Sequence, residues 1–314
     1  MPQFIGMDEA GYGPNLGPLV ITATAWEVPE APHACDLWRL LEEAVTEHPA
    51  CPEGRLHIAD SKRVFSPSRG LAALEASVLC LLRWGGYDVD SFHAVWRQLT
   101  VRTNQTEEQE PWFASDVKLP VAADVGVLDH RLDCLAHCAE KNGVHPPRVR
   151  CDVVLTDRFN RLSAQYNSKG RTLSSLSLSL LSKLWTRNFD DVCLIIADKH
   201  GGRNRYDELL ADVLDGEMIF RVQEGRECSI YRVGKTEIRF QTKAESHFPV
   251  AAASLVSKYL REIAMVAFNR FWRDQIPGLK PTQGYPQDAR RFRAEIAVRQ
   301  AALQIPDRIL WRER

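Results

Sequence analysis

Residues 4–18 read FIGMDEAGYGPNLGP, and this stretch predicts a strand that ends in two adjacent acids and a glycine-rich turn. The apolar residues at its start indicate the strand, and Gly-Tyr-Gly-Pro at 11–14 indicates a turn where backbone can approach a ligand closely. Neighbouring side chains on a strand point to opposite faces, so Asp8 and Glu9 can serve one site only where the strand ends and the backbone bends. A divalent cation could collect oxygens from both acids there, whereas the commoner use of such a pair is a solvated turn.

The composition is that of a chain with a substantial core and no global charge. At 314 residues, with 45% of them hydrophobic, it can form one large domain or two small ones. Lysine and arginine (40) nearly balance aspartate and glutamate (41), so any nucleic-acid surface would be a local patch. Residues 251–314 hold 12 basic against 6 acidic side chains, which makes this part of the chain the expected place to meet phosphates.

A cytoplasmic protein with reduced thiols and no membrane contact is expected. The sequence has no basic segment leading into an apolar one at its start, and no run near the roughly 18 apolar residues of a membrane helix. Its eight cysteines are scattered in a chain too large to depend on disulfides. Helical spacing could place His130, Cys134 and Cys138 on one face, but zinc would need a second ligand pair, so incidental thiols are the favoured interpretation.

Hydrophobic periodicity predicts alternating strands and helices along most of the chain. Strands are expected at 16–28, in a hairpin with the first strand, at the start of 148–162 before a loop, and at 190–202, 218–225, 228–234 and 236–242. Helices are expected at 36–48, from Ser66 to residue 84, at 129–143, 172–188 and 206–216, and from Pro249 onward. Residues 86–101 are interpreted as a continuation of the sheet or the start of a subdomain.

Residues 103–120, TNQTEEQEPWFASDVKLP, break this pattern and predict a linker or insertion. Trp112 and Phe113 within it could stack on a base, but an aromatic pair beside a proline more often fills a small local core.

The stretch GMDEAGYGPNLGPLV at 6–20 resembles the opening motif of the type 2 ribonucleases H, ribonuclease HII and its relatives. Asp60-Ser61-Lys62 resembles the family's DSKKL motif, whose serine and lysine contact substrate phosphates; without that resemblance a solvated cap would be preferred. The segment from Pro249 resembles its AAASxxAKxxRD helix, with Lys258 at the lysine position and arginine and an acid following at 261 and 262.

Residues 283–297, QGYPQDARRFRAEIA, resemble the GYPxD motif of archaeal and eukaryotic members, whose tyrosine packs on the sugar beside the cut. The resemblance makes Tyr285 a substrate contact, although a turn aromatic closing the core is an equal alternative. Arg290, Arg291 and Arg293 could add charge for the backbone or form an ordinary solvated helix face.

The resemblance also implies the remaining acids of a metal site. Asp198 ends an apolar run expected to be buried on both faces, and open α/β sheets hold ligands at such strand ends. The family order of helix, buried strand and terminal aspartate makes Asp198 the third metal ligand, while its rival Asp157 is kept as a structural residue. Glu245 takes the fourth position, where ribonuclease HII usually has aspartate, after a loop that is one residue shorter.

Four carboxylates, Asp8, Glu9, Asp198 and Glu245, could converge only by protonating or by binding cations. All-oxygen ligands favour Mg²⁺ or Mn²⁺ over zinc, and two such ions about 4 Å apart would suit phosphodiester hydrolysis. The resemblance implies endonucleolytic cleavage of RNA in RNA–DNA hybrids, or 5′ to a ribonucleotide embedded in duplex DNA, leaving a 5′-phosphate.

Selectivity for RNA requires a contact to the 2′-hydroxyl, which the family makes through a GRG turn. The matching residues are Gly11, Tyr12 and Gly13, with tyrosine in place of the usual arginine. The full set of implied substrate contacts is Gly11, Tyr12, Gly13, Ser61, Lys62, Lys258 and Tyr285.

The implied fold is α/β: a ribonuclease H-like mixed five-stranded sheet flanked by helices. Its core would comprise 1–101 and 151–270, with an insertion at 102–150 and a C-terminal helical substrate-binding region at 271–314. The expected partner is nucleic acid, with no obligate protein partner. Two alternatives stay open: a nuclease of the same architecture acting on DNA or structured nucleic acid, and a non-catalytic nucleic-acid-binding module.

Overall fold

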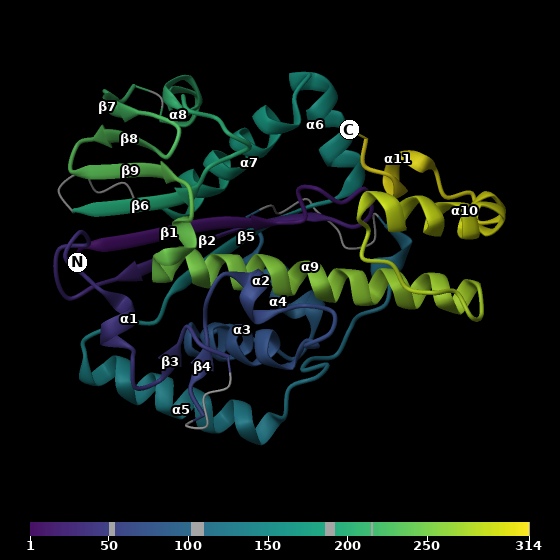
Figure 1. Cartoon of the computed structure of the whole chain (residues 1–314), viewed down its shortest axis with the longest axis horizontal. Coiled ribbons are helices and arrows are strands. Elements are labelled where there is room, and N and C mark those ends of the chain that lie inside the picture. The colour runs from purple at the N-terminus through teal and green to yellow at the C-terminus, as the bar shows by residue number, and fades with distance from the viewer. Residues whose placement is uncertain (50–53, 102–109, 186–191, 215, 314) are drawn as a thin grey trace.

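A mixed β-sheet runs through the centre of the computed structural model, which describes residues 1–49, 54–101, 110–185, 192–214 and 216–313. In the described residues the sheet has seven strands in the order β5-β2-β1-β6-β9-β8-β7 (Figure 1). In that order the strands are β5 (Arg148–Val154), β2 (Leu19–Glu27), β1 (Gln3–Ala10), β6 (Cys193–Asp198), β9 (Thr236–Gln241), β8 (Cys228–Val233) and β7 (Phe220–Glu224).

The expected fold class is confirmed, but the expected number of strands is too small. β5, β2 and β1 pair antiparallel, and β1, β6 and β9 pair parallel, which makes a mixed five-stranded core. β8 and β7 extend this core because the chain forms an antiparallel meander ending in β9, and each of its strands can pair with the next. The three segments at 218–242, whose pattern predicts strands that continue or flank the sheet, therefore continue it.

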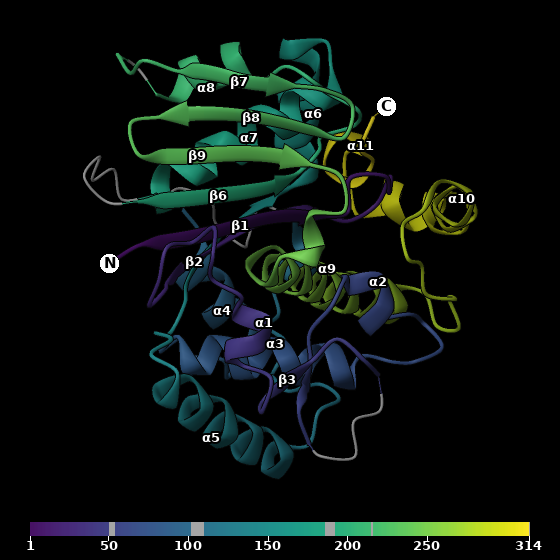
Figure 2. The ribbon, with the colours of Figure 1, turned by 60° about the vertical axis from the view of Figure 1, so that its left-hand side comes forward.

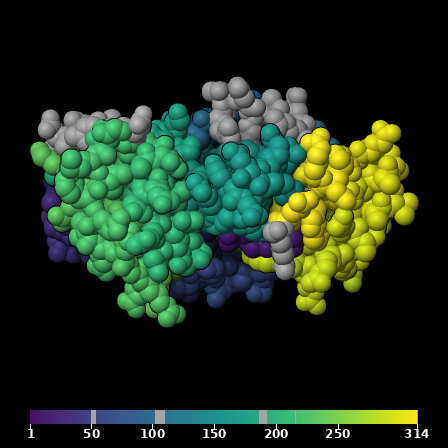
Figure 3. Space-filling view, turned by 90° about the horizontal axis from the view of Figure 1, so that it is seen from above, coloured from purple at the N-terminus to yellow at the C-terminus, as the bar shows by residue number. Residues whose placement is uncertain are grey.

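Helices cover both faces of the sheet. The α-helices of the described residues, in chain order, are α1 (Leu37–Leu40), α2 (Ser61–Val64), α3 (Ala72–Trp84), α4 (Phe92–Leu99), α5 (Val125–Lys141), α6 (Thr156–Tyr166), α7 (Lys169–Leu184), α8 (Asp207–Val213), α9 (Phe248–Gln275), α10 (Pro286–Ala302) and α11 (Asp307–Leu310). α9, α3 and α5 lie on one side, and α7 and α8 on the other (Figures 1 and 2). Seen from above, the β7–β9 region, α6 with α7, and the C-terminal helices lie in a row (Figure 3).

Successive side chains of β1 point to opposite faces of the sheet and contribute to two hydrophobic cores. Phe4 faces the core that α9 and α3 complete, while Ile5 and Met7 face the core that α7 completes. Gly6 is needed because α9 begins directly against this strand: a Cβ on Gly6 would lie 2.1 Å from the carbonyl carbon of Pro249. The small residues that follow this proline at 251–253 are buried, so α9 packs closely on the sheet.

Four expected elements are wrong. The helix at 36–48 spans only Leu37–Leu40, because the chain then forms the short strand β3 (Val45–Thr46), which pairs with β4 (Leu56–His57). The helix expected from Ser66 begins at Ala72, since Gly70 adopts φ +74°. Residues 92–99 form a helix capped by Ser91, so the continuation of the sheet, one of the two interpretations of 86–101, is wrong. Residues 156–166 form a helix rather than a loop.

The aromatic pair of the expected insertion belongs to the core. Trp112 and Phe113, on the short 3₁₀ helix η2 (Pro111–Phe113), are 3% and 1% exposed. The Trp112 ring packs 5.0 Å from Phe268 of α9 between centroids, so it is not available to a base. Residues 102–109 of the expected linker, 186–188 of an expected helix, and Cys51 lie outside the described residues.

None of the described helices combines the length and apolarity that crossing a bilayer requires. On α5, the Cys134 sulfur lies 3.8 Å from the ring of His130, while Cys138 is buried and donates to the carbonyl of Leu40.

Candidate active site

Two of the predicted acids lie where β1 and β6 stop pairing with each other: Asp8, two residues before the end of β1, and Asp198, the last residue of β6. The register pairs Met7 of β1 with Ala197 of β6, and Asp8 and Asp198 are the next residues of these two strands. Both backbones run in the same direction, so their carboxyl ends reach the same edge of the sheet. The carboxylates of Asp8 and Asp198 repel each other electrostatically at this edge.

Asp8 interacts with each of the three other predicted acids. Burial raises the pKa of Asp8 to about 7, and the charges of Asp198 and Glu245 act in the same direction. Two hydrogen bonds oppose this shift: the Ser254 hydroxyl and the backbone N–H of Glu9 both donate to the Asp8 carboxylate, the second at 2.8 Å. Asp8 is thus held in place by α9 while remaining hard to ionise.

Glu9 lies in the same environment and faces a lysine. Burial raises the pKa of Glu9 well above its usual range, and the charges of Asp8 and Asp198 add to the effect. Lys62 attracts the Glu9 carboxylate and opposes the shift. Lys62 of α2 is therefore near enough to the acids for its charge to act on Glu9 and Asp198.

Asp198 and Glu245 complete the group. Burial and the charge of Glu245 raise the pKa of Asp198, whose carboxylate accepts from the backbone N–H groups of Lys199 and Ala244. Glu245 lies on a 3₁₀ turn, η3 (Ala244–Ser246), between β9 and α9, and is half-buried. A glutamate on this turn thus reaches the neighbourhood of both strand ends.

The four acids match the chemistry of a hard divalent cation. Every donor is a carboxylate oxygen, and the pKa values of Asp8, Glu9 and Asp198 are raised, so the site favours added positive charge. Among the described residues, no three His, Cys, Asp or Glu side chains already adopt an arrangement that could hold an ion. Mutual repulsion keeps unneutralised carboxylates apart, so the side chains would have to draw together around a cation.

The glycine-rich turn is shaped by contacts from two distant segments. Gly11 has φ +91°, and a Cβ there would lie 2.6 Å from both the Arg261 side chain and the carbonyl oxygen of Pro18. The buried guanidinium of Arg312 donates to the backbone carbonyls of Gly11 and Pro14. The turn is therefore fixed from one side by α9 and from the other by the segment after α11.

Tyr12 and Gly13 differ in exposure. Burial, together with the charge of Glu9, raises the pKa of Tyr12, and the Lys169 ammonium lies 6.0 Å from its ring centroid. Tyr12 thus sits between an acid and the first residue of α7. Gly13 is exposed, and nothing lies within 4 Å of a Cβ built on it.

The predicted contacts on α2 and α9 adjoin one another. Ser61 is 8% exposed, whereas Lys62 is exposed, so only the lysine is freely presented. Lys258 lies 2.6 Å from the Glu262 carboxylate and 4.8 Å from the ring centroid of Phe65, which follows α2 directly. Lys258 is therefore engaged in an ion pair of its own helix.

Tyr285 projects beside the turn. Its side chain is 51% exposed, and the Arg261 guanidinium lies 5.9 Å from its ring centroid. Since Arg261 also borders Gly11, the exposed tyrosine is joined to the turn through one buried arginine. An exposed ring does not fit the alternative interpretation, in which the tyrosine closes the core.

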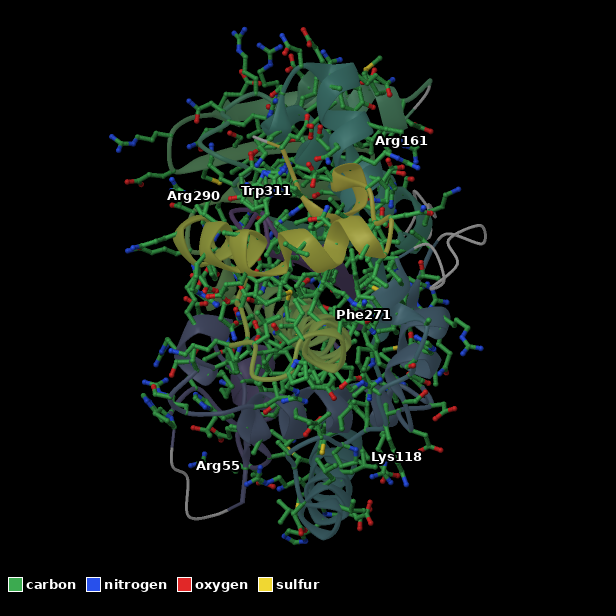
Figure 4. All side chains as sticks on the ribbon, turned by 90° about the vertical axis from the view of Figure 1, so that its right-hand side faces the viewer. Arg55, Lys118, Arg161, Phe271, Arg290 and Trp311 are labelled. Atoms are coloured by element: carbon green, nitrogen blue, oxygen red, sulfur yellow. The ribbon has the colours of Figure 1, made fainter. Side chains whose placement is uncertain are left out.

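The arginines of α10 are mostly engaged with acids of their own segment. Arg291 pairs with Asp288 and Glu295, each at 2.7 Å, and Arg293 pairs with Asp307 at 2.7 Å. Arg290 lies near one end of α10 (Figure 4) and donates to the carbonyl of Pro286. The interpretation as a solvated helix face fits Arg291 and Arg293.

Asp157, the rival of Asp198, lies on α6 and not at a strand end. It pairs with Arg161 at 3.0 Å and with Arg308 of α11 at 2.9 Å, which ties these two helices together.

Three residues of the site were missed from the sequence: Ser254, Lys169 and Arg312. Ser254 belongs to a run of small residues that predicted only close packing. Lys169 and Arg312 have no local signal, because nothing in their own stretches indicates the turn that they approach.

Comparisons with known proteins give a match in structure only. No family model matches the sequence, and no curated protein matches it. The ribonuclease H2 structure from Pyrococcus horikoshii OT3 has a TM-score of 0.50 and 14% identity, over 98% of this chain and 92% of that one. The ribonuclease HII structure from Archaeoglobus fulgidus, in its complex with PCNA, has a TM-score of 0.48 and 15% identity, over 99% and 94%. At these identities the likeness concerns the fold.

Proposed function

Since the chain has a fold like that of the type 2 ribonucleases H, we propose that it is a metal-dependent endonuclease acting on RNA–DNA hybrids or on ribonucleotides embedded in duplex DNA. The observation that carries the proposal is the electrostatic interaction of Asp8 with Glu9, Asp198 and Glu245. A site that had lost its function would not be expected to keep mutually repelling carboxylates half-buried. Without a cation, each such carboxylate lowers the free energy of unfolding.

The four acids would hold two Mg²⁺ or Mn²⁺ ions. When bound, such ions activate a water for in-line attack on a phosphodiester and stabilise the leaving 3′ oxygen. Ser254 and the N–H of Glu9 orient the Asp8 carboxylate, and the N–H groups of Lys199 and Ala244 orient that of Asp198. These bonds leave the remaining carboxylate lone pairs for ligation and limit how far the side chains can turn.

Substrate would be positioned by residues that surround the acids. Lys62 is drawn toward Glu9 and Asp198, so a phosphate placed between lysine and metal would be neutralised from both sides. Gly13 is exposed within the turn, and the half-exposed Tyr285 lies beside it. These positions suit contact with the sugar and its 2′-hydroxyl. Ser61, at the start of α2, would add its hydroxyl to the phosphate contact of Lys62.

The division of the chain follows from this arrangement. We assign residues 1–101 and 151–270 to the catalytic core, since they carry all four acids, and 271–314 to a substrate-binding region, since it carries Tyr285. Residues 102–150 are the insertion. Its described part supplies Trp112 to the core and α5 to the surface.

The test is cleavage of matched duplexes that contain no ribonucleotide, one ribonucleotide or an RNA tract, each with Mg²⁺ or Mn²⁺. We expect cuts only where RNA is present, leaving 5′-phosphates. Cleavage of the all-DNA duplex would favour a nuclease with another substrate, and silence on every duplex would favour a binding module.

Two variants make the assignment specific. Asp198→Asn removes one ligand and is expected to lower kcat by about a thousandfold or more, the scale on which metal-site ligands act. Asp157→Asn is the matched control, because it removes an aspartate that pairs only with surface arginines among its described partners. Equal activity of the two variants would contradict the proposed site.

A further inference from the structure

A second site, separate from the acids, is formed by a strongly basic pocket. It has a volume of about 200 Å³ and lies where the β3–β4 pair, the segment after α2 and the helix α5 meet. Its side chains include four arginines and two histidines: His48, Arg55, His57, Arg63, Arg69 and Arg131. Among the described residues that line it there is no aspartate or glutamate.

The pocket is distinct from the candidate active site. The groups that most strongly shift the pKa values of Asp8, Glu9 and Asp198 include none of the pocket residues. The charge of Lys62 acts on Glu9 and Asp198, whereas the next residue, Arg63, lines the pocket, so α2 supplies one side chain to each site. In Figure 4, Arg55 lies far from Arg290 of α10 and from Trp311, which follows α11.

Backbone carbonyls orient three of the pocket arginines. Arg55 donates to the carbonyl of Glu42 at 3.1 Å, and Arg63 donates to the carbonyl of Glu47 at 3.3 Å. Arg69 donates to the carbonyl of Arg63. A carbonyl fixes a guanidinium without cancelling its charge, so these bonds hold Arg63 and Arg69 as cations at the pocket, which is an arrangement that attracts an anion.

Two buried nitrogens of the pocket have no partner in the structure. They are Nε2 of His57, a residue 9% exposed, and Nε of Arg131. The His57 ring is fixed by a hydrogen bond to the backbone carbonyl of Glu47, so its other nitrogen is left for a ligand. Burial lowers the pKa of His57, and the charges of Arg63, Arg69 and His48 lower it further.

We propose that this pocket binds a phosphate group. A phosphate offers several acceptor oxygens to converging guanidinium groups, and it would offset a concentration of positive charge that otherwise destabilises the fold. The group could belong to a nucleic-acid backbone beyond the cleaved position or to a small phosphorylated molecule. The proposal does not depend on the activity of the acids, and it gives the 102–150 segment a role, because that segment supplies Arg131.

Binding of inorganic phosphate, measured by calorimetry in the presence of a chelator, is the direct test. The chelator prevents phosphate from binding through a metal ion held by the acids. We expect Arg69→Gln combined with Arg131→Gln to raise the Kd for phosphate by at least about tenfold, the effect of losing one charge-assisted hydrogen bond. Arg83→Gln is the matched control, since Arg83 of α3 pairs with Asp129 and does not line the pocket.

A second variant separates lost binding from lost folding. Arg131→Lys keeps the charge and should retain most phosphate affinity, whereas a general loss of structure would lower the melting temperature without phosphate in every variant. Equal phosphate affinity in the wild type and the double variant, or no phosphate binding by the wild type, would overturn the proposal.

The source of the phosphate is decided by duplex binding under the same metal-free conditions. Weaker binding of long duplexes by the double variant, but not by Arg83→Gln, would assign the pocket to the nucleic-acid backbone. Unchanged duplex binding together with lost phosphate binding would assign it to a small phosphorylated molecule.

Discussion

The side chain of Arg312 donates to the carbonyl of Gly11, a residue 301 positions earlier in the chain. The two segments are also joined through Asn15, whose amide donates to the carbonyl of Arg312 at 2.9 Å and whose carbonyl accepts from the Arg312 N–H at 2.8 Å. Burial and the neighbouring guanidinium of Arg261 lower the pKa of Arg312 to about 9, so this contact is made at an energetic cost. The C-terminal segment is thus part of the support of the glycine-rich turn.

Replacing Arg312 is expected to loosen that turn. Arg312→Met leaves two buried carbonyls without their donor, and we expect the free energy of unfolding to fall by about 2–3 kcal/mol. The measurement is urea denaturation, accompanied by kcat for the ribonucleotide-containing duplex, which should fall more than KM rises. Arg312→Lys should recover part of both. A variant with unchanged stability and unchanged kcat would show that the turn keeps its shape without this contact.

Gly6→Ala should be strongly destabilising. The added methyl group would meet the backbone of Pro249 and Val250, at 2.1 Å and 2.3 Å from their nearest atoms, so α9 would have to move away from β1. Backbone atoms cannot move away as a flexible side chain can. We therefore expect the free energy of unfolding to fall by about 3 kcal/mol or more. Gly13→Ala is the control for stability, because nothing lies within 4 Å of its Cβ. Similar melting temperatures for the two variants would contradict the close packing of strand and helix.

The acids predict an unusual dependence of stability on pH in the metal-free protein. Since burial raises the pKa of Asp8 from 3.8 to about 7, the folded state binds this proton more tightly than the unfolded state does. The resulting stabilisation is complete below pH 4 and is lost as the pH rises toward 7 and beyond. Melting temperatures in a chelator should therefore decline over this range, less steeply in Asp8→Asn.

Mn²⁺ should reverse that decline. A cation binds the ionised carboxylates, so it is expected to raise the melting temperature more at pH 8 than at pH 5. Equal shifts at both pH values, or equal shifts in the wild type and Asp8→Asn, would place the binding of Mn²⁺ elsewhere.

Lys62 is expected to contribute to substrate binding as a point charge. Lys62→Ala should weaken duplex binding in a chelator and reduce the slope of log K against log salt by about one. The matched control is Lys118→Ala, which removes an exposed lysine from the segment between η2 and α5. An unchanged salt slope for Lys62→Ala would show that this lysine meets no phosphate.

The sequence predicted the parts of the site whose signals are local. β1, β6 and α9 have apolar patterns with the right periods, and Asp198 stands at a recognisable strand end, whereas Asp8 and Glu9 lie inside β1, which continues to Ala10. The predictions from sequence were wrong or incomplete where contacts between distant residues determine the local structure. The expected helix at 36–48 yields to the pairing of β3 with β4, and Tyr285 could be placed beside Arg261 only by the fold.

The basic pocket was beyond sequence reasoning for the same reason. Five of its six basic side chains lie between residues 48 and 69, but they are irregularly spaced there, and only the fold brings Arg131 of α5 against them. The extra strands β8 and β7 were visible as strands, but their place in the sheet depended on which edge they joined.

The straight helix α9 has a consequence for the size of any bound duplex. Ser254 near its start holds Asp8, and Asn269 further along bonds to Thr282 of the C-terminal segment in both directions, at 2.9 Å and 2.8 Å. At 1.5 Å per residue these two anchor points are about 22 Å apart. A polymer that contacts both the acids beside Ser254 and the C-terminal segment beside Asn269 must therefore be at least about this long.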